Sequence, residues 1–333
     1  MLASGISSLH GITRNPWDLS RNTAGSSSGA GAGIAAGYGP FALGTDIGGS
    51  VRLPAAYNGL FALKPSLGRV PIYPPYLGRT TGPMTRSVRD AALLFAELTK
   101  PDARDFMALP YEARDWADLL ATDVKGKRLG LLLEIGAGLE VQPAVKGVIK
   151  KAAAAFESAG AEIEPAAAFL TPQMYRGLER FFQTRSLAEL ESLDHQRRAK
   201  VLPFIQQWCA LAEGTSGTAV IRAVADIMLI REKAVAAVQH FDFLLSPTSP
   251  ITAYAAEEPA PGADPRRAVE HWSFTAPFNM SEQPAASICA GYDAHGLPIG
   301  LQIIGQRFDD LGVLQMAYAY EQLRPTLRPW PEP

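Results

Sequence analysis

The sequence predicts an α/β fold in which a mixed central β-sheet is flanked by helices on both faces. Residues 127–134, 143–160 and 161–165 read as strand, helix and strand, a unit that is usually parallel and right-handed. Residues 284–292 and 297–305 read as two strands joined by a short turn, which is typical of an antiparallel pair. Helical patterns elsewhere in the chain would cover both faces of such a sheet.

The first 85 residues are rich in Gly, Ser and Pro, a composition that can indicate a flexible linker. Apolar stretches alternate with these residues, among them "VRLPAAYNGLFAL" (51–63) and "RVPIYP" (69–74). Linkers lack such stretches, so we interpret this region as tightly built backbone around a site.

Ordinary helical and strand patterns follow along the chain. Apolar residues recur at helical spacing over 87–98, which predicts a helix. In the helix predicted over 143–160, Pro143 suits the first turn and Gly160 suits the position just after the end.

The second half of the chain begins with a helical region. Residues 172–240 are mostly helical in pattern, with a polar break at 213–217. A strand then runs into a Pro-rich loop at 241–250, Asp293 and Gly296 lie in the predicted turn, and a helix closes the chain. We predict one domain over 1–333, with a core in 1–100, a helical region at about 165–240 and C-terminal strands and a helix in 241–325.

Composition disfavours several classes of protein. With 31 basic and 33 acidic residues the net charge is −2, which gives no electrostatic footprint for nucleic acid or an anionic membrane. No apolar run reaches membrane-spanning length and the first residues do not resemble a signal peptide, so we expect a cytoplasmic protein. Cys209 and Cys289 fit no metal or redox spacing, which predicts two reduced, buried thiols and no metal or cofactor.

Two serine clusters carry the candidate chemistry, "AGSSSGAGAG" (24–33) and "ALGTDIGGSVRLP" (42–54). Gly48 and Gly49 directly before Ser50 let the backbone turn sharply and direct consecutive N–H groups at one point. Such N–H groups form an oxyanion hole for acyl transfer, and a serine beside them can act as a nucleophile if a base activates it.

Two other interpretations of the first cluster are weaker. Residues 31–36 match G-x-G-x-x-A of dinucleotide-binding folds, but no strand precedes them and Asp46 comes too early for the ribose-binding acid. Residues 25–29 match G-x-S-x-G of α/β-hydrolases, centred on Ser27, although the preceding residues are polar. A Ser-His-Asp hydrolase on Ser27 stays open, with five histidines as candidates: His10, His195, His240, His271 and His295.

Residues 25–71 as a whole resemble the amidase signature family nearly position by position. The resemblance continues at 81–95 and returns at 241–250, 274–287 and 296–310, around a divergent middle. It implies the amidase signature fold and the hydrolysis of a small-molecule amide through a serine acyl-enzyme.

Carried over residue by residue, the resemblance makes Ser50 the nucleophile and Ser26 the bridging serine, which follows a cis peptide bond from Gly25. It assigns the oxyanion hole to four backbone N–H groups, those of Ile47, Gly48, Gly49 and Ser50. Ser27 and Thr45 match positions that hydrogen-bond around the serines, Asp46 and Arg52 match a structural pair that flanks the turn, and Lys64 matches a structural position.

The family's catalytic lysine lies several dozen residues before the first serine cluster. Here 25 residues precede Ser26 and none is lysine. We therefore expect a member shortened at its N-terminus, which lacks the N-terminal helices and strand of the fold, through a misplaced start codon or as a natural remnant. Because general-base assistance is worth about 10²- to 10⁴-fold in rate, this form is expected to be nearly inactive.

Two further functions stay open beside the free-standing amidase. In the A subunit of tRNA-dependent glutamine amidotransferases, an aspartate that holds glutamine precedes the "FT" of the late motif, where this sequence has Trp272 and Ser273. The arginine-bearing segment of those proteins is also not recognisable in 214–232, so we favour the free-standing enzyme. A non-catalytic scaffold is the second alternative, and among partners a homodimer is left open while nucleic acid and membranes are not expected.

Overall fold

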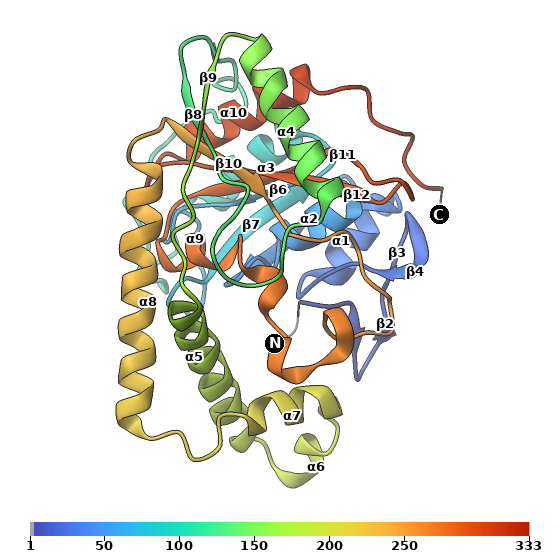
Figure 1. The fold of residues 1–333 in the computed structure, drawn as a ribbon, viewed down its shortest axis with the longest axis vertical. Coiled ribbons are helices and arrows are strands. Elements are labelled where there is room, and N and C mark those ends of the chain that lie inside the picture. Colours follow the sequence, from blue (N-terminus) through green and yellow to red (C-terminus); the bar gives the residue numbers. More distant parts are fainter. Residues whose placement is uncertain (1–2, 333) are drawn as a thin grey trace.

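An eight-stranded mixed sheet forms the centre of the structure, a computed structural model that describes residues 3–332 (Figure 1). The strand order is β5-β7-β6-β11-β12-β10-β8-β9. Neighbours are antiparallel except for the β10–β8 and β8–β9 pairs, which are parallel. The strands are β5 (Phe41–Asp46), β6 (Phe61–Lys64), β7 (Thr80–Thr85), β8 (Arg128–Leu131), β9 (Glu162–Pro165), β10 (Phe243–Pro247), β11 (Ala285–Tyr292) and β12 (Pro298–Ile304). The predicted fold class is confirmed, while both ends of the predicted domain lie outside the described residues.

Helices cover both faces of this sheet. On β12, Gly300 faces Ala56 of α2, whereas Gly305 just beyond the strand faces Val313 of α10. Since side chains alternate along a strand, α2 and α10 lie on opposite faces. Helices α3 and α4 pack with α10, and α1 packs with α2. The helices are α1 (Ser28–Ala35), α2 (Arg52–Asn58), α3 (Val88–Leu98), α4 (Pro143–Ser158), α5 (Pro172–Glu191), α6 (His195–Arg198), α7 (Pro203–Ala210), α8 (Gly217–Val238), α9 (Ala276–Met280) and α10 (Asp310–Leu323).

Local sequence signals set the helix limits where they were predicted. The side chain of Ser87 accepts a hydrogen bond from the Asp90 N–H and caps α3. Helix α4 has Pro143 in its first turn, and Gly160 follows its end with a φ of +97°. Strand β8 is shorter than the predicted 127–134, although the N–H of Leu132 still donates to the Leu245 carbonyl (2.8 Å).

Strands β11 and β12 form the predicted antiparallel hairpin. Its turn is closed by the Gly296 N–H, which donates to the Asp293 carbonyl at 3.0 Å. Gly296 has a φ of +82°, in the left-handed region that favours glycine. This hairpin brings the late part of the chain beside β6 in the sheet, because β11 also pairs with β6.

Residues 3–85 are ordered backbone, as interpreted from the apolar stretches in this region. Two small hairpins, β1 (Ile6–Ser7) with β2 (Gly11–Ile12) and β3 (Arg14–Asn15) with β4 (Asp18–Asn22), precede α1. Buried asparagines tie these hairpins to the core: the Asn22 side chain accepts from the Gly5 N–H (3.0 Å), and the Asn15 amide donates to the Tyr57 carbonyl (2.8 Å). Residues 51–70 are buried throughout.

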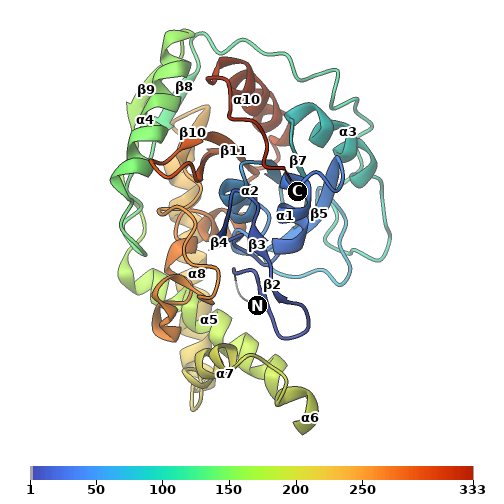
Figure 2. The ribbon, with the colours of Figure 1, turned by 90° about the vertical axis from the view of Figure 1, so that its right-hand side faces the viewer.

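The middle of the chain forms a helical lobe at one end of the molecule (Figure 1). Helices α5 and α8 pack along each other, and α7 packs against α5. Figure 2 shows α6 and α7 beyond the sheet, on the side where the N-terminal hairpins lie. Helices α5 to α8 lie within 172–238, and the polar stretch 213–217 runs from the gap after α7 to the first residue of α8.

The structure also bears on the predictions for the two cysteines and for membrane-spanning segments. Cys209 and Cys289 are free and buried, which confirms them as unpaired thiols. None of the helices in residues 3–332 combines the length and the apolar character that crossing a membrane requires.

Candidate active site

Ser50 lies in the turn that connects β5 to α2. The strand ends at Asp46, the turn contains Ile47, Gly48 and Gly49, and α2 begins at Arg52. Gly49 has a φ of +128°, and a side chain there would also collide with the Thr275 hydroxyl. Gly49 is therefore required by backbone conformation and by the close approach of a distant segment.

A buried ion pair fixes the two ends of this turn. Arg52 donates from Nε to Asp46 Oδ2 and from Nη2 to Asp46 Oδ1, both at 3.0 Å, and both side chains are fully buried. The carboxylate also accepts from the Gly49 N–H (2.7 Å) and the Val51 N–H (3.2 Å). Burial acts to raise the pKa of Asp46, but Arg52 and the Asn279 amide outweigh it and lower the pKa to about 2. Asp46 and Arg52, which the resemblance places beside the turn, thus form a buried ion pair.

Three polar residues that the sequence reasoning missed complete the surroundings of Arg52. The Gln302 side chain accepts from Arg52 Nη1 (2.7 Å), the Thr275 carbonyl accepts from the same nitrogen (3.1 Å), and Asn279 Oδ1 accepts from Nη2 (2.6 Å). Thr275 and Asn279 lie in 274–287, one of the stretches that carry the family resemblance. The family resemblance over 274–287 was therefore the sequence signal that could have pointed to Thr275 and Asn279.

The turn leaves backbone donors free. Within residues 3–332, the N–H groups of Ile47, Gly48 and Ser50 make no hydrogen bond. Gly49 is the exception among the four predicted oxyanion donors, because its N–H is taken by the Asp46 carboxylate. A charged acceptor holds this N–H more strongly than a neutral one would, so the set of free donors is reduced to three.

The first serine cluster meets the second through the backbone. The Ser27 N–H donates to the Ser50 carbonyl (3.3 Å), and the Ser27 hydroxyl lies 3.5 Å from the Thr45 carbonyl. The Gly25–Ser26 peptide bond is cis, as the resemblance implied. Thr45 takes part through its backbone oxygen, and its own side chain is exposed.

Ser26 is exposed and opens into a cavity of about 370 Å³. One wall comes from the N-terminal segment, and the other comes from Val201, Leu202 and Ile205 at the start of α7. In the part of the chain that the structure describes, the hydroxyls of Ser26 and Ser50 make no hydrogen bond to a lysine or a histidine.

An aromatic side chain closes the turn from the other side. A Cβ on Gly48 would lie 2.9 Å from the Trp272 ring, so the ring packs directly on the backbone. Trp272 is held by Phe182, with ring centroids 6.0 Å apart, and by His271, whose Nε2 accepts from the indole N–H (3.1 Å). Burial lowers the pKa of His271 to about 3, so this histidine is neutral. The wall beside the turn is therefore apolar and uncharged.

Lys64 lies at the end of β6, fully buried. Its Nζ donates to the Pro65 carbonyl (2.9 Å). Burial, with the Arg52 charge as a second cause, lowers the pKa of Lys64 to about 7. These contacts are compatible with the structural position that the resemblance implied.

The other interpretations of the serine clusters find little support. Strand β4, which precedes Ser27, belongs to a two-stranded hairpin outside the central sheet, and residues 31–35 lie inside α1 rather than in a phosphate-binding loop. His271 is engaged with Trp272, and no histidine within 3–332 is hydrogen-bonded to Ser27. The same residues contain no group of three or more His, Cys, Asp and Glu side chains that could hold a metal ion.

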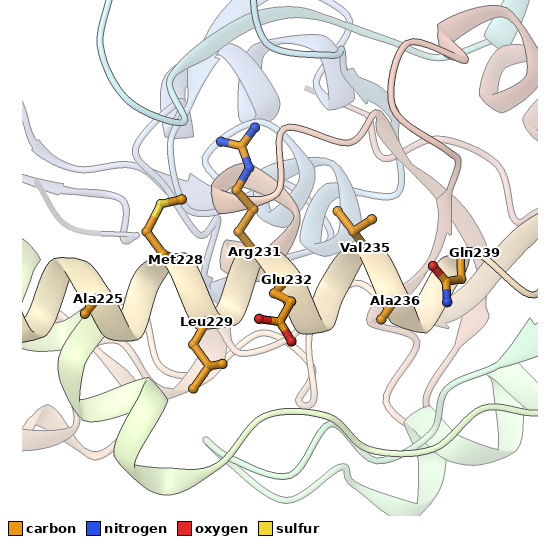
Figure 3. A pocket seen from close by; sticks show the side chains of 8 residues that line it. All are labelled: Ala225, Met228, Leu229, Arg231, Glu232, Val235, Ala236 and Gln239. Carbon is orange, nitrogen blue, oxygen red and sulfur yellow. The ribbon is translucent and has the colours of Figure 1, made fainter.

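A surface groove of about 690 Å³ lies elsewhere, along α8 (Figure 3). Seven of the eight lining residues belong to α8 and the eighth, Gln239, directly follows it; none of the predicted site residues is among them. The cavity at Ser26 is therefore the better candidate for an active site, since Ser26 and Ser28 of the first serine cluster line it.

Comparisons with known proteins agree with this geometry. The family described as Amidase matches residues 1–314. The A subunit of glutamyl-tRNA(Gln) amidotransferase from Cyanothece sp. is 34% identical over 354 residues, covering 98% of this chain and 73% of that protein. The structure of a bacterial aryl acylamidase of the amidase signature family superimposes with a TM-score of 0.88 at 31% identity, covering 98% of this chain and 70% of the other. That of 6-aminohexanoate cyclic dimer hydrolase gives 0.85 at 26% identity, covering 99% and 74%.

The chain belongs to the amidase signature family. It is an enzyme of the class that hydrolyses the carbon–nitrogen bond of amides.

Proposed function

We propose that this chain is a free-standing serine amidohydrolase in which Ser50 attacks the amide carbonyl. Ser26 acts as the bridging serine, and the N–H groups of Ile47, Gly48 and Ser50 bind the oxyanion. The observation that carries the proposal is the Ser27 N–H to Ser50 carbonyl hydrogen bond, which joins the two serine clusters beside the free donors.

The chemistry follows from where charge develops. As Ser50 adds to the carbonyl, negative charge forms on the oxygen, and each well-placed N–H donor is worth about 3 kcal/mol there. The Ser50 proton passes to Ser26 and on to the leaving amine, which leaves an acyl-enzyme that water hydrolyses. Since no lysine or histidine of residues 3–332 is bonded to Ser26, we expect slow turnover by these 333 residues.

The substrate is proposed to be a small amide with an uncharged acyl group. Trp272 packs on the oxyanion turn, and the cavity at Ser26 is lined by serines together with Val201, Leu202 and Ile205. Among residues 3–332, no charged side chain lines that cavity, which disfavours a charged acyl group.

Covalent labelling with a fluorophosphonate probe tests the assignment of the nucleophile. The unsubstituted protein should form one adduct, Ser50→Ala should form none, and Ser26→Ala should label more slowly. Ser28→Ala is the matched control, because Ser28 lines the same cavity without a proposed role, and it should label normally. An adduct that survives Ser50→Ala would overturn the assignment, and its loss in Ser27→Ala would favour a Ser-His-Asp hydrolase instead.

A second candidate function is the A subunit of a glutamine amidotransferase, which the Cyanothece relative's name favours. That name includes glutamyl-tRNA, so our expectation that no nucleic acid takes part stays a prediction. Against this candidate, the buried Trp272 and Ser273 stand where an aspartate would hold glutamine. Comparing ammonia release from glutamine with hydrolysis of a neutral aryl amide separates the two, and we expect the aryl amide to react faster.

A further inference from the structure

The buried side chain of Asn279 gathers several groups of the turn that carries Ser50. Asn279 is 1% exposed. Its Nδ2 lies 3.1 Å from the Asp46 carbonyl oxygen, 2.8 Å from Asp46 Oδ1 and 3.0 Å from the Gly78 carbonyl oxygen. Its Oδ1 accepts from Arg52 Nη2 (2.6 Å). Because arginine only donates, Oδ1 must face Arg52, and this fixes the amide nitrogen toward the three acceptors.

The hydrogen bond from Asn279 to the Asp46 carbonyl also bears on the direction of the Ile47 N–H. In a planar trans peptide group the C=O and the N–H point in opposite directions. The Asp46 carbonyl is held by Asn279, so the Ile47 N–H of the same peptide group points away from Asn279. Within residues 3–332 that N–H makes no hydrogen bond.

A second peptide group of the turn is anchored in the same manner. The Gly49 carbonyl accepts from the Leu53 N–H in the first turn of α2 (2.7 Å), and the Ser50 N–H at the other side of that peptide group is free. Two of the three free donors are thus oriented by a hydrogen bond made by the carbonyl of their own peptide group.

We propose that Asn279 is a positioning residue for the oxyanion site. By holding the Asp46 carbonyl, it directs the Ile47 N–H at the oxygen of the amide that Ser50 attacks. The inference rests on the proposed function of Ser50. Asp46 also pairs with Thr80 in the β5–β7 ladder, and among the side-chain donors to its carbonyl Asn279 (3.1 Å) is closer than the Thr80 hydroxyl (3.5 Å).

If Asn279 had only a structural role, its substitution would lower the folded fraction but not the labelling rate of folded molecules. Its bond to Arg52 supports the fold, so loss of the amide lowers the fraction of folded protein whichever role is correct. Only misdirection of the Ile47 N–H also lowers the maximal rate at which folded molecules react. Substrate binding is unaffected, so the half-saturating probe concentration stays constant.

The experiment measures Ser50 labelling by a fluorophosphonate in Asn279→Leu and Asn279→Ser, with rates normalised to the folded fraction from urea unfolding. Removing an oxyanion donor costs about 10²- to 10³-fold, so misdirecting one in Asn279→Leu should lower the maximal rate by about 10- to 100-fold. In Asn279→Ser the hydroxyl retains one donor and the rate should fall in between. Gln306→Ala is the control, because the Gln306 amide donates to the Val238 and Phe241 carbonyls, away from the turn. This variant should label at the rate of the unsubstituted protein.

The proposal would be overturned if either Asn279 variant labelled at the same maximal rate per folded molecule as the unsubstituted protein. It would also be overturned if only the half-saturating probe concentration changed. If Asn279→Leu does not fold, Asn279→Ser decides by the same criterion. Failure of the unsubstituted protein to label at Ser50 contradicts the proposed function itself and is seen before any variant is compared.

Discussion

At the scale of single residues, the Asp46 carboxylate organises the candidate site. It accepts from Arg52 and from two backbone N–H groups, and Asn279 donates to it as well. Each contact is made inside the protein, where a charge without partners would be strongly unfavourable. The same contacts decide which N–H groups of the turn remain free for a substrate.

Lys64 offers a prediction on how stability depends on pH. Its pKa is about 7 in the folded protein and near 10.5 when unfolded, so the folded state favours the neutral amine. Between pH 7 and 10.5 the unfolded chain holds the proton that the folded chain has lost, so stability rises with pH, by up to about 1.4 kcal/mol per unit. Lys64→Met removes this contribution.

Urea unfolding of the unsubstituted protein and Lys64→Met at pH 6 and pH 9 provides the measurement. The stability of the variant relative to the unsubstituted protein should be highest at pH 6, where the buried amine is charged, and should decrease by pH 9. An identical difference at the two pH values would contradict a lowered pKa for Lys64.

At the scale of elements, the α5–α8 pair depends on one glycine. A side chain at Gly177 would collide with Asp226 of α8, including its Cβ, which cannot move independently of the helix. The two helices approach closely only because Gly177 has no side chain. The lobe they form also contains α7, whose first residues line the cavity at Ser26.

Gly177→Ala should therefore lower the free energy of unfolding by about 1–3 kcal/mol, since it overpacks the helix contact. Gly147→Ala is the matched control: Gly147 lies within α4 with nothing within 4 Å of an added Cβ. That change should raise stability by about 0.5–1 kcal/mol through helix propensity. Thermal or urea unfolding measures both, and equal effects would contradict close packing at Gly177.

Helix limits were largely predictable because their signals are local. Ser87, Pro143 and Gly160 act within a few residues of the helix end that each one marks. The short hairpins before α1 were not predicted. Their strands have two to five residues and are held by distant contacts, such as the Asn22 N–H donating to the Tyr254 carbonyl (2.7 Å).

At the scale of the whole molecule, Asp310 at the start of α10 links the last helix to the segment that follows β6. Its fully buried carboxylate accepts from the Ser66 N–H (2.7 Å) and from Arg69 Nε (3.1 Å), in the segment that follows β6. Arg69 also pairs with Glu112 on its exposed side. The segment after the candidate site is thus tied to the last helix.

Asp310→Ala should lower the free energy of unfolding by about 3–5 kcal/mol, because it leaves the Arg69 guanidinium buried without its inner partner. Glu112→Ala removes the outer partner, whose side chain is 40% exposed, and should cost no more than about 1 kcal/mol. Denaturant titration of both variants is the measurement, and a larger loss in Glu112→Ala would contradict the assignment of the inner pair.

The sequence by itself determined the mixed α/β sheet, the limits of α3 and α4 and the serine and glycine clusters, because periodicity, capping residues and turn glycines act over short distances. Only the tertiary structure decided which N–H groups stay free and which polar residues surround Arg52. Asn279 donates to Asp46, from which it is separated by 233 positions in the chain. The Gly49 N–H donates to the carboxylate of the same Asp46. Such partners are selected by packing between distant segments, which no local pattern encodes.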